Sequence, residues 1–362
     1  MQLIRDWYKR HFENPQVMGL AVVLIVGFAA FLVLGNMLAP VLASLVLAYL
    51  LEGLVRMLER RRVPRLLAVN IVFLFFFVGL LLLFFAIIPV VAGQVAQLID
   101  ELPRILNAAQ ALVLQLPQQY PQLFSEEQVT DIIFAVRREA LDFGQRLVTS
   151  FSVQSVLVLV TLMVYLVLLP FLVFFFLKDK ARLVGWFTHY LPRDRDLLVT
   201  IWRDIDRQIG NYIRGKFVEI FIVWVVTYLT FSFFGLSFAM LLSLAVGLSV
   251  IIPYIGAAVV TLPVGIIAYF QFGFGDTFIW IMIAYLVIQA LDGNVLVPIL
   301  FSEVVNLHPV AIIVAILVFG GIWGFWGVFF AIPLATVIQA ILKAWPRVDE
   351  VGEADAGEEE SA

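Results

Sequence analysis

Gln289-Ala-Leu-Asp-Gly-Asn-Val-Leu-Val-Pro298 places an acid and two amides between long apolar runs, and this segment is the most informative in the chain. It lies in a stretch of 126 residues, Phe217 to Leu342, that has no lysine or arginine. The stretch has four carboxylates: Glu219, Asp276, Asp292 and Glu303. Polar groups among membrane-length apolar segments are costly, which makes them functional candidates. We therefore take this stretch as the functional core of a membrane protein.

The composition is that of a polytopic membrane protein. Hydrophobic residues make up 63% of the chain, and the mean hydropathy is +1.03. We predict an all-α fold with about eight transmembrane segments, some of them broken or re-entrant, since each crossing needs roughly 20 apolar residues. A small helical extracytoplasmic region is also expected. There are no cysteines, which excludes disulfides, thiol catalysis and cysteine-bound metal.

The first 91 residues predict three spans, at Val17–Gly35, Val41–Val55 and Leu66–Val91. Met1–Gln16 is polar, and the first apolar run is long enough to remain as an anchor rather than a cleaved signal. Five arginines follow the second span, between Arg56 and Arg65. The positive-inside rule therefore places this loop and the N-terminus in the cytoplasm.

Residues 92–152 are polar, with seven acids against four arginines, and are expected outside the membrane on the extracytoplasmic side. Ser125–Gln128 resembles a capping box at a helix start. Apolar residues then recur at helical spacing from Val129 to Leu147. This stripe could pack on its own domain or on the membrane surface; alternatively it could form an oligomer contact or a lid.

A fourth span is predicted over residues 153–177, followed by a basic cytoplasmic loop over 178–216. This loop has nine basic residues against five acids. Between Leu197 and Tyr212 an amphipathic helix is expected on the inner interface, either as ordinary packing or as a transmitter of movement. Residues 343–362 form an acidic tail that we expect to be disordered and cytoplasmic.

The core, residues 217–342, shows two interruptions of its apolar runs, Ile252–Gly256 and Phe319–Gly327. An even number of crossings should join its two cytoplasmic ends, with surplus length that suggests broken helices. A weak repeat links the halves. Gly256 and Gly327 are 71 residues apart, as are Phe238 and Pro309, while Pro263 and Pro333 are 70 apart. Matching interruptions in two halves indicate a transporter binding site. The repeat could be inverted or parallel.

Asp292 is the strongest candidate for a functional side chain. Its protonation at membrane depth could couple to solute or cation movement. The alternative is an acid at a loop end, helped into a turn by Gly293 and Asn294. Gln289 and Asn294 could donate hydrogen bonds to a polyhydroxy solute without carrying charge.

Four further polar residues are weaker candidates. Glu303 and His308 could pair with Asp292 or be solvated. Glu219 follows Lys216 closely, so it could simply pair with that lysine. Tyr254 lies in a non-helical break, which is tolerated at membrane depth only where protein or a water-filled cavity covers it.

A third group of residues is expected to shape the helix breaks. They could act as a gate or could allow close helix packing. The group comprises Pro253, Gly256, Pro298, Gly320, Gly321, Gly324 and Gly327.

Enzyme chemistry is not expected. Gly273-Phe-Gly-Asp276 matches the G-x-G-D of intramembrane aspartyl proteases, but those enzymes need a second aspartate, and Phe217–Phe272 has none. We find no Walker motif, metal-ligand cluster or Ser/His/Asp arrangement. The sequence therefore predicts no cofactor and no bound metal, and no basic patch suggests nucleic acid.

Several motifs together resemble the autoinducer-2 exporter family of permeases, over about Val17 to Leu342. The resemblance is closest to its PerM-type branch, which Ser302, Trp323 and Trp326 fit better than they fit the signal exporters. The motifs are Phe175–Asp179, Gly210–Lys216, Pro253–Gly256, Gln289–Asn294 with Pro298, Phe301–Pro309, and Gly320–Gly327 before Ile332–Leu334.

The resemblance implies a multi-pass protein of the bacterial inner membrane, homo-oligomeric, that moves small solutes. Some relatives are associated with export of autoinducer-2 and others with sodium–proton exchange. We therefore expect a secondary transporter of a small polar solute, with its site between the Pro253–Gly256 break and Gln289–Pro298. The alternatives are a cation–proton antiporter and a non-transporting membrane scaffold.

Overall fold

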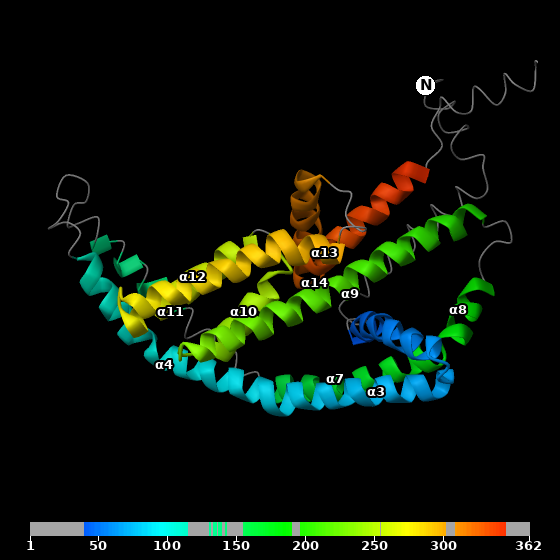
Figure 1. Cartoon of the computed structure of the whole chain (residues 1–362), viewed down its shortest axis with the longest axis horizontal. Helices are drawn as coiled ribbons and strands as arrows, with labels where there is room; N and C mark the ends of the chain where they lie inside the picture. Colours follow the sequence, from blue (N-terminus) through cyan, green and yellow to red (C-terminus); the bar gives the residue numbers. More distant parts are fainter. Residues whose placement is uncertain are drawn as a thin grey trace, which may run out of the picture. The chain divides into compact units, whose positions relative to one another are not determined.

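A computed structural model describes residues 40–114, 130–131, 133–135, 137–139, 142, 155–189, 196–253, 255–301 and 308–344. Within these ranges every regular element is a helix and none is a strand (Figure 1), which confirms the all-α class. The predicted span Val17–Gly35, the capping box Ser125–Gln128 and the acidic tail lie outside the described residues. The stripe from Val129 to Leu147 lies mostly outside them.

The helices follow one another with short connections. A helix covers Pro40–Arg60. The later elements are α3 (Arg65–Leu82), the π-helix η1 (Leu83–Ile87), α4 (Ile88–Val113), α7 (Ser155–Lys178), α8 (Lys180–His189), α9 (Asp196–Phe233), α10 (Ala239–Ser249), α11 (Ile255–Phe272), α12 (Asp276–Leu291), the π-helix η2 (Asp292–Leu296), α13 (Val297–Phe301) and α14 (Pro309–Ala344).

Five of the described helices are long and apolar enough to cross a membrane. They cover Pro40–Arg60, Arg65–Ala111, Asp206–Phe233, Ile255–Phe272 and Asp276–Phe301. Their outward faces are strongly apolar: Phe75 and Phe85 are 73% and 70% exposed. Lipid chains can solvate such side chains, whereas water would not. The chain is therefore a multi-pass membrane protein.

The third predicted span extends further than expected. The sequence placed its end near Val91, but helix continues through η1 and α4 to Val113. The π-turn of η1 lies directly before Pro89. Proline has no N–H to donate to the preceding turn, and a π-turn is one way in which a helix absorbs such a defect. Likewise α9 continues the amphipathic stretch directly into the following apolar segment.

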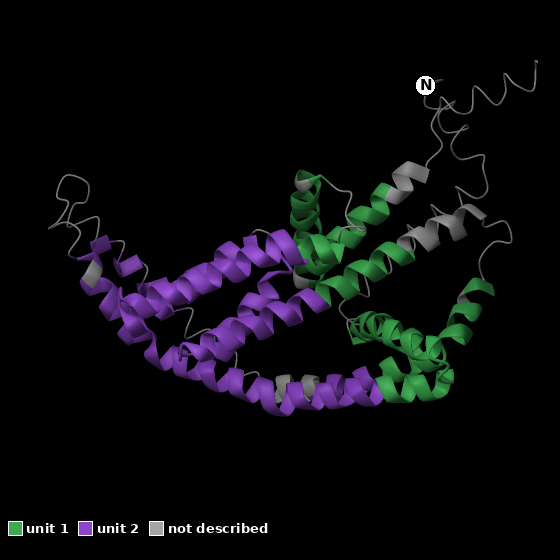
Figure 2. Ribbon diagram, viewed as in Figure 1, with its two compact units in different colours: residues 1–72, 171–217, 297–362 green, residues 73–170, 218–296 purple. Residues whose placement is uncertain are grey.

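The described chain forms two compact units (Figure 2). Unit 1 comprises residues 1–72, 171–217 and 297–362, and unit 2 comprises residues 73–170 and 218–296. In unit 2 the core is built by α9, α10, α11 and α12, with Phe231, Val246, Val264 and Tyr285 at its centre. In unit 1 a smaller core joins Tyr212 and Ile213 of α9 to Phe301 and Ile332.

Each unit contains a helix–break–helix hairpin. In unit 2 the hairpin is α10 and α11; α10 has 11 residues, about 16 Å of helix against the roughly 30 Å of a bilayer core. In unit 1, α14 is interrupted at Gly324, which separates two short apolar helices, Val310–Gly324 and Trp326–Gln339. The breaks fall in the two interruptions that the sequence shows, so the expectation of broken helices is confirmed.

Candidate functional site

Asp292 and Gln289 lie together where α12 changes into a π-turn. Asp292 ends α12 and begins η2, and its Oδ1 is shielded from solvent. Gln289 is three residues earlier, on the same side of the helix. Its Nε2 is buried and has no hydrogen-bond partner among the described residues. The structure therefore brings these two predicted residues together.

The other predicted residues are placed differently. Asn294 is exposed, and its Nδ2 donates to the carbonyl of Ala290 at 2.8 Å, which gives it a local role in the π-turn. His308 is exposed in unit 1, and its Nδ1 accepts from the backbone N–H of Val310 at 3.3 Å, where α14 begins. Pro298 is exposed in α13. Tyr254 and Glu303 lie outside the described residues.

Glu219 is nearly completely buried, with 1% of its surface exposed. It lies on α9, in unit 2. Lys216, three residues earlier and in unit 1, has its Nζ 5.2 Å from the centroid of the Phe301 ring, in a cation–π arrangement. A carboxylate buried to this extent is a functional candidate in a membrane helix.

Two more buried polar groups on α9 were not singled out from the sequence. Thr227 is fully buried, and neither its Oγ1 nor the indole Nε1 of Trp224 has a hydrogen-bond partner within the described ranges. Buried polar groups are normally paired, so each such group needs an explanation. Their i, i+3 spacing was visible in the sequence, but isolated threonine and tryptophan residues are common in apolar helices and carried no separate signal.

The helical register relates Thr227 to Gln289. The rings of Phe231 on α9 and Tyr285 on α12 have centroids 6.3 Å apart. The two helices run in opposite directions (Figure 1). Each rises 1.5 Å per residue, so four residues back along α9 and four forward along α12 lead to the same level. Thr227 is therefore level with Gln289, and by the same reckoning Trp224 is level with Asp292.

Close packing of α10 holds this part of α9. A Cβ on Gly247 would lie 2.7 Å from the Cβ of Trp224 and 3.0 Å from the carbonyl oxygen of Ile220. On α12, the hydroxyl of Tyr285 lies 3.0 Å from Thr261 Oγ1 and 3.3 Å from the carbonyl oxygen of Ala257, both on α11. The neighbouring hairpin thus orders both helices that carry the buried polar groups.

We call Glu219, Trp224, Thr227, Gln289 and Asp292 the polar band of unit 2. An indole N–H and an amide donate hydrogen bonds, a hydroxyl both donates and accepts, and carboxylates accept them. Such a mixture suits a small solute that carries both donors and acceptors. Among the described residues, no group of three or more histidines, cysteines, aspartates or glutamates could hold a metal ion.

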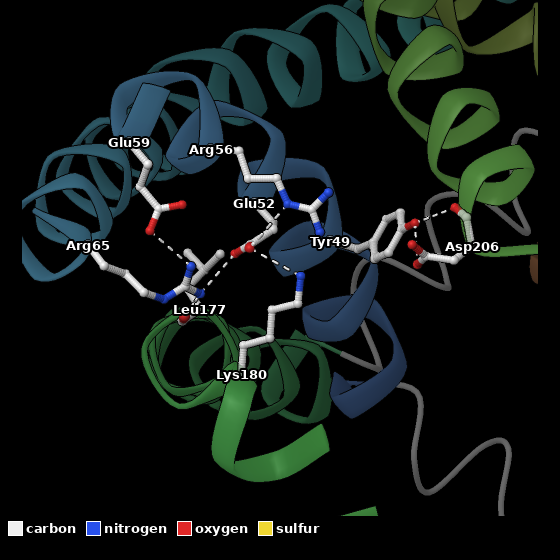
Figure 3. Close-up of polar contacts among 8 residues, drawn as sticks. All are labelled: Tyr49, Glu52, Arg56, Glu59, Arg65, Leu177, Lys180 and Asp206. Carbon is white, nitrogen blue, oxygen red and sulfur yellow. Dashed lines mark hydrogen bonds and ion pairs between the residues drawn. The ribbon is translucent and has the colours of Figure 1, made fainter. Parts of the chain in front are cut away.

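Unit 1 contains a second polar cluster, centred on Glu52 (Figure 3). This carboxylate is 7% exposed, and three cations surround it. They are Lys180 Nζ at 3.1 Å, Arg65 Nη2 at 3.3 Å and Arg56 Nε at 3.5 Å. Arg65 also pairs with Glu59 at 3.2 Å and donates to the carbonyl of Leu177 at 3.0 Å. The cluster ties the helix Pro40–Arg60 to α3, α7 and α8.

A further contact extends from the same helix. The hydroxyl of Tyr49 donates to Asp206 Oδ1 of α9 at 2.7 Å (Figure 3). The Glu52 cluster and this contact were not found from sequence, because their partners are far apart along the chain. Neither reaches the polar band, which lies in unit 2.

Comparisons with known proteins agree with this architecture. Residues 21–347 match the family model described as AI-2E family transporter. PerM of Escherichia coli (strain K12), by name a permease, is 45% identical over 346 residues, which cover 96% of this chain and 98% of that protein. The transport protein YueF of Bacillus subtilis (strain 168) is 27% identical over 92% of each chain. The AI-2 transport protein TqsA of E. coli (strain K12) is 23% identical over 90% of this chain and 92% of that protein.

Proposed function

The chain belongs to the AI-2E family of transporters, and from this premise we propose that it is a secondary transporter that exports a small polar solute. A permease or transport protein, not an enzyme, is what the relatives' names indicate. The substrate named for TqsA is carried by a relative of only 23% identity, so we propose the solute by chemistry and not by that name. The cell is bacterial, the membrane is the inner membrane, both termini are cytoplasmic, and the protein works as a homo-oligomer.

The observation that carries this proposal is the level shared by Thr227 and Gln289. Both have a buried polar atom without a hydrogen-bond partner among the described residues. Leaving such a group unpaired costs about 1–3 kcal/mol, which a bound solute with hydroxyl or carbonyl groups would recover. The donor and acceptor content of the polar band favours an uncharged, oxygen-rich solute over a metal ion.

Asp292 and Glu219 supply the coupling in this proposal. A carboxylate in an apolar environment changes its charge at a large energetic difference, so proton binding and solute binding at one band influence each other. The helix breaks at Pro253–Gly256 and Gly320–Gly327 give the hairpins points at which they can bend. Solute release would follow from movement at these breaks.

The test uses the full chain in proteoliposomes that contain a pH-sensitive dye. Proton and sodium gradients are imposed with and without a panel of neutral polyhydroxy solutes. We expect solute-dependent dissipation of the proton gradient, lost in Asp292→Asn and kept in Asp276→Asn. Asp276 is the matched control because it is an exposed acid in the first turn of the same helix. Flux that persists unchanged in Asp292→Asn contradicts the assigned role.

A cation–proton antiporter is the second candidate, favoured by the two carboxylates of the polar band. It predicts sodium-dependent dissipation of the pH gradient without any solute, again lost in Asp292→Asn. A scaffold that does not transport predicts no flux under any condition, and a cellular phenotype that survives Asp292→Asn but is lost when residues 349–362 are deleted.

A further inference from the structure

The turn between the helix Pro40–Arg60 and α3 presents three consecutive arginines. Arg60, Arg61 and Arg62 are exposed, and none forms an ion pair within the part of the chain that the structure describes. Lys178 and Arg182 are also exposed, on either side of the junction of α7 and α8. We call these five residues the basic corner of unit 1.

The Glu52 cluster holds the two halves of the basic corner together. Glu52 contacts both Arg65, the first residue of α3, and Lys180, the first residue of α8. Arg65 also donates to the carbonyl of Leu177, next to Lys178. The two carboxylates of the cluster, Glu52 and Glu59, are engaged with the inner cations. The outer cations are left with Asp179 as the nearby acid, so the corner is strongly positive.

An apolar surface adjoins this charge. On α8, Leu183, Val184 and Trp186 are 36%, 52% and 57% exposed. Leu66 and Leu67, directly after Arg65, are also mostly exposed. A helix with basic residues beside exposed apolar and tryptophan side chains is typical of one that lies in the membrane interface.

The backbone at Arg62 adds an independent observation. Arg62 has φ +67° and ends its helix, with its N–H donating to the carbonyl of Glu59 at 2.9 Å and the N–H of Val63 donating to that of Leu58 at 3.2 Å. This left-handed position at a helix end usually holds glycine, because a Cβ is unfavourable there. A residue kept in such a conformation suggests a role for its side chain.

We propose that the basic corner binds the phosphate headgroup of an anionic phospholipid from the leaflet that it faces, with acyl chains along Leu66, Leu67 and the exposed face of α8. Lysines and arginines next to membrane helices attract anionic headgroups in this way. The apolar surface distinguishes this ligand from a free anion, which would have no use for it. The site is separate from the polar band and does not depend on the transported solute.

The test measures thermal unfolding of the purified full chain in neutral detergent, with added phosphatidylglycerol, phosphatidylcholine or inorganic phosphate. We expect phosphatidylglycerol alone to raise the midpoint, because a ligand that binds only the folded state stabilises it. The rise should fall to less than half in Arg60→Gln/Arg61→Gln, and should weaken at high salt. Arg104→Gln/Arg138→Gln is the matched control, since it removes two exposed arginines from unit 2, and should keep the full rise.

Arg62→Gly separates a lipid role from a structural one. This variant relieves the left-handed strain, so its midpoint without lipid should equal or exceed that of the wild type, while its response to phosphatidylglycerol shrinks. An equal rise with phosphatidylcholine, a full rise in the Arg60→Gln/Arg61→Gln variant, or a full rise with inorganic phosphate alone would each overturn the proposal. The last result would identify a free-anion site instead.

Discussion

Gly327 packs directly against the carbonyl oxygen of Phe319: a Cβ at position 327 would lie 1.8 Å from that oxygen. Residues eight apart in a continuous helix would be about 12 Å apart along the axis, so this contact exists only because α14 folds back on itself. The turn is made at Gly324, whose φ of +59° and ψ of −133° are accessible mainly to glycine. Unit 2 has the corresponding contact, between Gly256 and the carbonyl oxygen of Ser249, also at 1.8 Å.

Gly327→Ala should destabilise the α14 hairpin by about 1–3 kcal/mol, because the added methyl forces the two arms apart. Thermal unfolding in detergent measures this loss. Gly321→Ala is the control, since nothing lies within 4 Å of a Cβ at that position, and should leave stability unchanged or slightly raised. Equal midpoints for the two variants would show that the close contact is not required.

Thr227→Val should reduce solute flux roughly tenfold, the equivalent of about 1.4 kcal/mol for one lost hydrogen bond. Its stability should stay the same or increase, because the variant removes a buried polar atom that has no protein partner in the described structure. Thr230→Val is the matched control, one turn away on the same helix, where the hydroxyl instead bonds to the carbonyl of Val226. A loss of stability without loss of flux would mean that Thr227 has a structural role.

Gly247→Ala should lower the apparent affinity for solute, because α10 can accommodate the new methyl only by displacing Trp224 or the backbone of Ile220. Flux at several solute concentrations separates an affinity effect from a change in maximal rate. Gly93→Ala, also in unit 2, introduces a methyl into open space and should behave like the wild type. An unchanged affinity would remove Trp224 from the solute site.

Tyr285→Phe should cost about 1 kcal/mol of stability through the lost hydrogen bonds to Thr261 and the carbonyl of Ala257. The ring contact with Phe231 should persist, since the phenyl ring occupies the same space. Thermal unfolding again provides the measurement. Thr261→Val should lose a similar amount, and the double variant should lose less than the sum, as expected for partners in one contact.

Glu52→Gln should destabilise the protein by about 1–3 kcal/mol, since three cations would then repel one another around a neutral amide. We keep this figure modest because Arg56, Arg65 and Lys180 are each at least one-third exposed. Glu59→Gln breaks one ion pair and should cost less than about 1 kcal/mol. Equal losses in the two variants would show that Glu52 is not the centre of the cluster.

The candidate site was only partly predictable from the sequence. Asp292 and Gln289 were identified because charge and amides are conspicuous in a stretch without basic residues. Asn294 was expected at the same site, yet it bonds locally to Ala290. Thr227 gains its importance only from the antiparallel register of α9 and α12, which the Phe231–Tyr285 contact reveals.

By itself, the sequence determined the membrane class, the approximate spans and the positions of the helix breaks. Hydropathy, proline and glycine act locally: about 20 apolar residues form a span, and a glycine-rich interruption ends a helix wherever it occurs. Tertiary structure alone decided that Glu52 gathers three cations from separate segments, that Gly327 meets Phe319, and that Thr227 is level with Gln289. These relationships depend on which helix faces pack together, and side-chain packing between distant segments leaves no periodic pattern in a single sequence.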